Sequence, residues 1–316
     1  MADGRKYPWV EIAVIIAVIF FLATSIYYRN WTGFAAGLFS FTPIIIFYIY
    51  YSKKVFISAS VILAATLLLY AGWLEGLFLI FTYICSSIIM GELLRKARPP
   101  EQIVLAGMFP SFISGIGLWF LQAYRNHEGP INYFRQITLQ NLKETVQYYE
   151  KIGMDKDKID ILNASLNDLA SWFLYLFPGI YIAGLIFMFF LNFLLVRYIL
   201  IKLEKREYLF HPLTSWFASD HLVWGWIASC ILLMLPVGEI KVVGGNLLIV
   251  FSLLYFLQGL ALVAYYFKKR GVRTIWQFFS YFILLIWPLL GIVVALFGLF
   301  DIWIDFRKIR IGTSKN

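Results

Sequence analysis

One polar stretch, residues 124–168, interrupts a chain that otherwise consists mainly of long apolar runs. Several of these runs approach 20 residues, the length that a helix needs to cross the hydrocarbon core of a bilayer. The chain is 61% hydrophobic and only 14% charged, whereas about a quarter of the residues in a soluble domain are charged. The sequence therefore predicts an all-α, polytopic transmembrane protein, and by itself it does not indicate an activity.

The polar stretch divides the expected fold into three parts. Residues 1–123 should form an N-terminal membrane block of five spans, residues 124–168 an extramembrane helical hairpin, and residues 169–316 a C-terminal membrane block of about four spans with a basic tail. The first apolar run lacks a small-residue cleavage site, so we expect a retained span and not a signal peptide. The nine expected spans are residues 8–27, 33–51, 55–71, 77–94, 103–121, 169–201, 222–235, 247–267 and 275–300.

The polar stretch has the pattern of two amphipathic helices. The first should begin at Gly129-Pro130, because proline is tolerated in the first turn of a helix, and should end near Gly153. Asp155 is a suitable N-cap for the second helix, which continues into the sixth span. Two interpretations stay open: a hairpin that packs on the membrane face of the protein, and a module that binds a partner.

Basic residues in short loops predict the orientation, because lysine and arginine stay on the cytoplasmic side. With the N-terminus inside, the inner segments hold 14 basic residues, whereas the short outer loops hold only Arg29 and Lys241. Residues 124–168 then face outward. Nine spans also leave the basic tail outside, against the same rule, so the side of the tail stays open. The inner basic residues are Arg5, Lys6, Lys53, Lys54, Arg95, Lys96, Arg98, Lys202, Lys205, Arg206, Lys268, Lys269, Arg270 and Arg273.

No arrangement of residues points to catalysis, a cofactor or a metal site. The sequence contains no HExxH, GxSxG or Walker motif. Its two cysteines, Cys85 and Cys230, lie in apolar runs, and its three histidines lie in polar connectors. The formal charge of +9 sits largely in short loops, which favours a membrane surface over nucleic acid as the partner. We therefore expect a protein that is not an enzyme.

Polar groups inside the spans are the default candidates for function, because they are costly in a bilayer. Gln258, beside Gly259, falls in the middle of the eighth span and needs a hydrogen-bond partner, either in a ligand or within the protein. Asn192 lies nearer the end of its span. Ala13 and Ala17 have the four-residue spacing that lets helices approach closely, and packing inside the monomer is the simplest role for them.

The tail offers a second set of candidates. Asp301 and Asp305 are four residues apart, so a helix would place them on one face. A carboxylate near a helix C-terminus is mildly unfavourable, and Arg307 or the bases at residues 268–273 could compensate the charge. A solvated helix end and a docking site for a partner explain this pattern equally well.

Three segments resemble the YybS-like family of bacterial integral membrane proteins, a domain of unknown function. They are the connector Trp216-Phe217-x-x-Asp220-x-Leu222-Val223-Trp224, the run Tyr255-Phe256-Leu257-Gln258-Gly259-Leu260-Ala261, and the ending Gly298-Leu299-Phe300-Asp301-x-Trp303-x-Asp305-Phe306-Arg307. The resemblance covers nearly the whole chain and adds Asp220 to the candidate contacts. It implies the cytoplasmic (inner) membrane of a bacterium, and it implies no activity.

The first block is also similar, more faintly, to the substrate-binding membrane subunits of energy-coupling-factor vitamin transporters. The likeness rests on the Ala-x-x-x-Ala span, on Thr42-Pro43 before an apolar run, and on Gly91 before Arg95-Lys96. It implies that Ala13 and Ala17 contact a partner subunit. The helical insert and three further spans depart from that pattern.

These observations favour a transport-related membrane subunit that binds a small solute or lipid between its helices. The alternative is a scaffold without transport activity, which recruits other envelope proteins through the insert and the tail. An intramembrane enzyme is the third hypothesis. In each case the lipid bilayer is the primary partner, a small-molecule or lipid ligand and a membrane-protein partner are further candidates, and nucleic acid is not expected.

Overall fold

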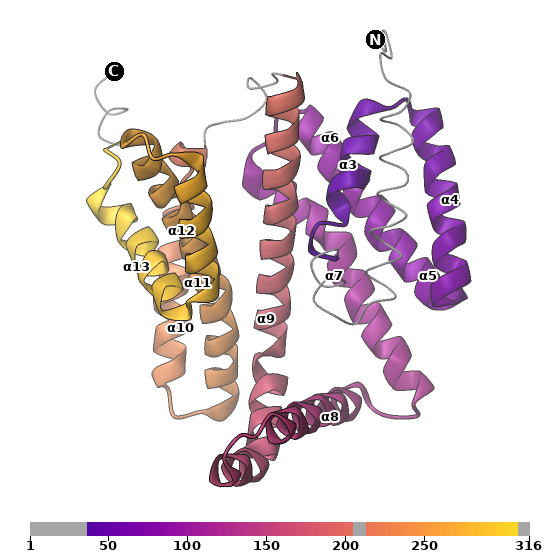
Figure 1. Ribbon diagram of the computed structural model, residues 1–316, viewed down its shortest axis with the longest axis vertical. Helices are drawn as coiled ribbons and strands as arrows, with labels where there is room; N and C mark the ends of the chain where they lie inside the picture. The colour runs from indigo at the N-terminus through magenta and orange to yellow at the C-terminus, as the bar shows by residue number, and fades with distance from the viewer. Residues whose placement is uncertain (1–36, 205–212, 309–316) are drawn as a thin grey trace. The chain divides into compact units, whose positions relative to one another are not determined.

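The computed structural model describes residues 37–204 and 213–308 of the 316-residue chain (Figure 1). Within these ranges the regular structure is helical throughout, as the sequence predicted. The elements are α3 (Phe41–Tyr50), α4 (Lys53–Ala71), α5 (Trp73–Ile80), a π-helical turn (Phe81–Cys85), α6 (Ser86–Arg95), α7 (Pro100–Arg125), α8 (Pro130–Lys151), α9 (Lys156–Glu204), a 3-10 turn (Leu213–Ser215), α10 (Leu222–Met234), α11 (Gly238–Lys269), α12 (Thr274–Ile286) and α13 (Pro288–Ile304).

Four helical segments in the described ranges are long and apolar enough to cross a membrane, and a fifth is added if α12 and α13 count as one bent span. The helices α3 and α10 are apolar but shorter, with 10 and 13 residues. The nine-span count is therefore not confirmed, and the expected span at residues 8–27 lies outside the described residues. The four segments are Trp73–Arg95, Pro100–Arg125, Lys156–Lys202 and Gly238–Lys269.

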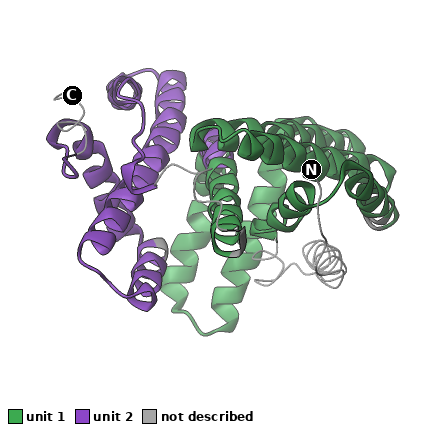
Figure 2. Cartoon of the chain, turned by 90° about the horizontal axis from the view of Figure 1, so that it is seen from above, with its two compact units in different colours: residues 1–174, 184–210 green, residues 175–183, 211–316 purple. Residues whose placement is uncertain are grey.

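The chain forms two compact units, coloured separately in Figure 2. One unit contains residues 1–174 and 184–210, and the other contains residues 175–183 and 211–316. The long helix α9 contributes to both. These boundaries differ from the three parts expected from the sequence, whose division at 124–168 follows polarity and not tertiary contacts.

In the first unit, an asparagine joins α3 to α9. Asn192 is completely buried; its side-chain oxygen accepts hydrogen bonds from the backbone N–H of Thr42 (2.9 Å) and from the Thr42 hydroxyl (2.8 Å). Its amide nitrogen donates to the carbonyls of Leu38 (2.7 Å) and Met188 (2.9 Å). The amide thus uses all of its hydrogen-bonding capacity, and it gives the Thr42 N–H a second acceptor beside the carbonyl of Phe39 (3.2 Å).

The polar insert forms the helical hairpin that the sequence predicted. The helix α8 begins at Pro130, and the chain turns after it at Gly153, whose φ of +84° is a conformation that glycine adopts readily. The hairpin has its own apolar core, in which Val146 of α8 packs with Ile159 and Leu166 of α9. With 49 residues, α9 is about 74 Å long at 1.5 Å per residue. It is more than twice as long as the roughly 30 Å hydrocarbon core, so it must project beyond the bilayer.

In the second unit, the side chain of Asn246 forms hydrogen bonds with the backbone of α9 beside a proline. Pro178 lies inside the helix and interrupts its hydrogen bonding. The backbone N–H of Gly179 donates to Oδ1 of Asn246 (2.5 Å), and Nδ2 of Asn246 donates to the carbonyl of Tyr175 (2.8 Å). One amide from α11 thus bonds to backbone groups on both sides of the proline, where an apolar environment favours full pairing.

The segment expected as one interrupted span at residues 275–300 consists of two helices in the structure. Here α12 ends at Ile286 and α13 begins at Pro288, and the two helices are bent by 104°. Trp287 between them is extended (φ −101°, ψ 99°), because the residue before a proline avoids helical geometry. The expected eighth span is also longer than predicted, since α11 begins at Gly238 and includes Asn246.

Candidate functional site

The predicted candidate Gly259 lies where α11 and α13 cross with their backbones in contact. A Cβ atom added to Gly259 would lie 2.1 Å from the carbonyl oxygen of Val294, and one added to Gly298 would lie 2.1 Å from the carbonyl oxygen of Tyr255. Neither position can carry a side chain without separating the helices. Glycine at both positions is therefore what allows this close crossing.

Gln258, the adjacent candidate, is completely buried and bonds within the protein. Its Oε1 accepts a hydrogen bond from the backbone N–H of Ala218 (3.1 Å), which ties α11 to the connector before α10. Its Nε2 and the hydroxyl of Tyr255, three residues earlier in α11, are buried and have no hydrogen-bond partner in the described structure. Because buried polar groups are normally paired, this face of α11 keeps a capacity to bind a polar atom, and a ligand contact at Gln258 stays a prediction.

The ending that the sequence singled out forms a buried ion pair. Arg307 donates from Nε and Nη2 to Oδ2 of Asp301, at 3.0 and 2.6 Å, and both side chains are fully buried. Nη1 of Arg307 donates to the backbone carbonyls of Thr214 (2.8 Å) and Trp216 (2.9 Å). The guanidinium carbon lies 3.7 Å from the centre of the Phe217 ring, a cation–π arrangement. The sequence had suggested Arg307 as the compensating charge, but it could not indicate the connector carbonyls.

The other carboxylates of this region lie differently from the predicted helix face. The helix α13 ends at Ile304, and Asp305 follows it in the left-handed conformation (φ 46°), with its N–H donating to the carbonyl of Asp301 (3.1 Å). Asp305 therefore lies outside the helix that carries Asp301. Asp220 is exposed in the connector, where its carbonyl accepts a hydrogen bond from Val223. Partner contacts at these residues stay a prediction, and those at Ala13 and Ala17 lie outside the described residues.

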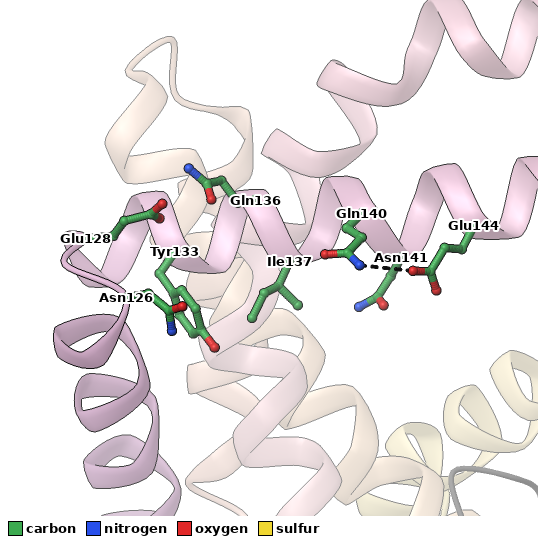
Figure 3. Close-up of a pocket in the computed structure, with 8 residues that line it drawn as sticks. All are labelled: Asn126, Glu128, Tyr133, Gln136, Ile137, Gln140, Asn141 and Glu144. Atoms are coloured by element: carbon green, nitrogen blue, oxygen red, sulfur yellow. Dashed lines mark hydrogen bonds between the residues drawn. The ribbon is translucent and has the colours of Figure 1, made fainter.

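A polar groove on α8 is a candidate that the sequence did not single out. It has a volume of about 780 Å³, and Figure 3 shows the side chains of Tyr133, Ile137 and Asn141 on one side of the helix. A second hollow of about 470 Å³ shares Gln136, Gln140 and Glu144 with it. The first groove is lined by Asn126, Glu128, Tyr133, Gln136, Ile137, Gln140, Asn141 and Glu144.

Four amides, two carboxylates and a phenol give this groove a definite chemical character. Nε2 of Gln140 donates to Oε1 of Glu144 (3.1 Å), and Oε2 of Glu128 has no hydrogen-bond partner in the described part of the chain. No basic side chain lines the groove, and the nearby Arg125 is paired with Glu75. The groove thus offers many donors and acceptors and an excess of negative charge. A face rich in Asn and Gln was the available signal, but the amphipathic pattern alone did not distinguish it from the rest of the polar side of the helix.

The cysteines and the possible metal ligands are the remaining candidates for chemistry. Cys85 and Cys230 are free thiols. Among the residues that the structure describes, no three His, Cys, Asp or Glu side chains come together in a way that could hold a metal ion.

Comparison with known proteins gives one match. A family model described as "Predicted membrane protein (DUF2232)" matches residues 14–302. No curated protein and no solved structure matches the chain. The matched region includes the α8 groove, the crossing of α11 and α13, and Asp301, and it ends before Asp305 and Arg307.

Proposed function

Because the chain belongs to the DUF2232 family of predicted membrane proteins, we propose that it is a transport-related membrane subunit that binds a small polar solute in the α8 groove. The groove itself is the observation that supports this function. It lies outside the membrane-spanning segments, and its volume is in the range of small-ligand sites. The site thus lies on the insert, whereas the sequence had favoured a ligand between the spanning helices.

The groove's chemistry limits the class of solute. The carboxylates of Glu128 and Glu144, without a basic side chain between them, would repel an anion. The amides of Gln136 and Asn141 can donate and accept hydrogen bonds, and the Tyr133 ring offers a flat apolar surface. A neutral polyol or an amine meets these conditions, because each presents hydroxyl or amine hydrogens to the acceptors of the groove.

We further propose that the protein lies in the cytoplasmic membrane of a bacterium with the insert outside. The distribution of basic residues supports this orientation, as does the resemblance to the YybS-like family. We place the tail on the cytoplasmic side too, because its contacts lead to segments that carry the inner basic residues. Arg307 is bonded to the connector at Thr214 and Trp216, and the Tyr266 hydroxyl donates to the carbonyl of Phe306 (3.2 Å). The connector and the end of α11 both adjoin inner basic segments, so α12 and α13 would enter the membrane and return to the same side.

Single cysteines in a background without Cys85 and Cys230 test this topology in intact cells. We expect a membrane-impermeant thiol reagent to label Asn141→Cys from outside, and to label Arg98→Cys, Arg270→Cys and Lys308→Cys only after permeabilisation. Labelling of Arg98→Cys from outside would reverse the orientation. Labelling of Lys308→Cys alone from outside would show that α12 and α13 together cross the membrane.

The solute-binding function is tested by ligand-dependent stabilisation of the purified protein. A specific ligand raises the melting temperature by mass action, so a screen of polyols, amines and vitamins should yield a stabilising compound. We expect Tyr133→Ala combined with Asn141→Ala to weaken its binding at least tenfold, equivalent to about 1.4 kcal/mol. Arg135→Gln is the matched control, because this exposed residue of α8 lines neither hollow.

The alternative function, a scaffold that recruits envelope proteins, is favoured by the separate apolar core of the hairpin. A scaffold would show no stabilising solute, and the Tyr133→Ala and Asn141→Ala changes would instead reduce the recovery of a cross-linked partner. That pair of results would replace the solute-binding proposal.

A further inference from the structure

We propose that the second unit holds a specific site for one anionic phospholipid, with the acyl chain in a groove between α11 and α13 and the headgroup at the basic turn that follows α11. This site is distinct from the α8 groove and does not depend on the proposed solute function. The name lipid groove is used below for the hollow lined by Leu262, Val263 and Phe267 of α11 with Val294 and Phe297 of α13.

The lipid groove is an apolar hollow of about 310 Å³ beside the crossing of the two helices. Gly259 lies at one end of it, where the backbones of α11 and α13 touch, and Tyr266 and Phe267 lie toward the end of α11. Both helices belong to strongly apolar segments. An apolar hollow on a membrane-embedded surface is open to lipid chains and is not suited to a polar solute, since nothing there could replace the hydration of that solute.

The basic turn consists of Lys268, Lys269, Arg270 and Arg273, all of which are exposed. None of the ion pairs in the described structure includes any of the four. Lys269 lies over the ring of Tyr265, with Nζ 6.0 Å from the ring centre. Four positive charges within six residues form a concentrated site for an anion.

The turn is held in a fixed conformation beside the lipid groove. Gly271 adopts a φ of +60°; its N–H donates to the carbonyl of Lys268 (3.2 Å), and the N–H of Val272 donates to the carbonyl of Phe267 (3.0 Å). This pair of bonds is the glycine-terminated helix end known as a Schellman motif. The Gln277 side chain of α12 then donates to the carbonyl of Val272 (2.7 Å). The charges are therefore presented by an ordered turn and not by a freely moving loop.

Sequence and contacts place the two halves of the site next to each other. Phe267 lines the groove and immediately precedes Lys268. The Phe267 ring also packs against Tyr281 of α12, with ring centres 5.7 Å apart. A soluble phosphate would use only the basic turn, and a neutral lipid would use only the groove. An anionic phospholipid is the partner that uses both, because its phosphate and its acyl chain are covalently linked.

The test measures binding of defined lipids to the purified, delipidated full-length protein by native mass spectrometry and by melting temperature. We expect added phosphatidylglycerol to bind and to raise the melting temperature. Phosphatidylcholine of the same chain length should bind at least fivefold more weakly, and glycerol phosphate should have no effect. Equal binding of the two lipids would overturn the proposal, and binding of glycerol phosphate as strong as that of phosphatidylglycerol would reduce the site to an anion site.

Two variants separate the halves of the site. The charge variant Lys268→Gln, Lys269→Gln, Arg270→Gln, Arg273→Gln should abolish the preference for phosphatidylglycerol, whereas Arg135→Gln, Lys143→Gln, Lys151→Gln, Lys156→Gln in the insert should retain it. Val263→Trp should fill the lipid groove and weaken the binding of both lipids. Val243→Trp, at an exposed position of α11, should leave the binding of both lipids unchanged. An unchanged preference in the charge variant, or unchanged lipid binding in Val263→Trp at normal lipid-free stability, would exclude the site.

Discussion

Replacement of Gly298 by alanine should cause one of the largest losses of stability in this protein. Its new Cβ atom would lie 2.1 Å from the carbonyl oxygen of Tyr255 and 2.6 Å from the backbone nitrogen of Gly259. Because these obstacles are backbone atoms, no side-chain rotation can remove the clash, and α11 and α13 must separate. The separation also opens the core in which Tyr255 packs with Val223 and Leu299. We expect a loss of about 3 kcal/mol, the upper end of the usual cost of overpacking.

The measurement is the unfolding free energy, or the melting temperature, of the purified protein. Gly184→Ala is the matched control, because Gly184 lies inside α9 with no other atoms within 4 Å of an added Cβ. Alanine there should be neutral or should stabilise by up to about 1 kcal/mol, since alanine favours a helix over glycine. Equal stability of Gly298→Ala and Gly184→Ala would show that the backbones of α11 and α13 do not cross as closely as described.

Replacement of Arg307 by methionine should be comparably severe. It leaves the carboxylate of Asp301 completely buried without its cation. It also leaves the carbonyls of Thr214 and Trp216 without their donor. Breaking one side of a buried ion pair costs about 3–5 kcal/mol, so a loss of that size is expected in the unfolding free energy.

The double variant Asp301→Asn, Arg307→Met provides the internal comparison. It removes both charges, and asparagine can keep the hydrogen bond from the backbone N–H of Phe306, which now reaches Oδ1 of Asp301 at 3.0 Å. We therefore expect the double variant to be more stable than Arg307→Met alone. Equal stability of the two variants would mean that the charges are not buried together. This comparison also bears on the tail as a docking site, because normal partner recovery with the stable double variant would argue against a docking role for these charges.

Local signals made the hairpin predictable from the sequence. Gly129-Pro130 fixed the start of α8 and Gly153 marked the turn after it, because both depend on backbone preferences of the residues themselves. The amphipathic pattern likewise predicted an apolar face for this helix, and Val146 of α8 packs in the hairpin core. The helical class followed from the apolar runs, but their number did not translate into a count of spans, since α10 and α12 have only 13 residues each.

Contacts between distant residues were not predictable. Asn246 lies just before the predicted eighth span at residues 247–267, but its side chain bonds to the backbone of a helix 67 residues away. The carbonyls that bind Arg307 lie 93 and 91 residues before it. The backbone contact at Gly259 was equally hidden, because a glycine in an apolar run is common and only the fold shows which one touches another helix. These features depend on tertiary packing, which no local pattern encodes.

The repair of α9 by Asn246 has a consequence for how the chain is made. The ribosome completes Pro178 and Gly179 well before Asn246, so this part of α9 first enters the membrane without the two hydrogen bonds that Asn246 makes to the N–H of Gly179 and the carbonyl of Tyr175. Pro178 already weakens the helical hydrogen bonding of this turn, and backbone groups without partners are costly in hydrocarbon, so the turn gains stability when α11 arrives. The second half of the protein therefore acts on the first during biogenesis, and α9 reaches its final bonding only after the chain has been extended through α11.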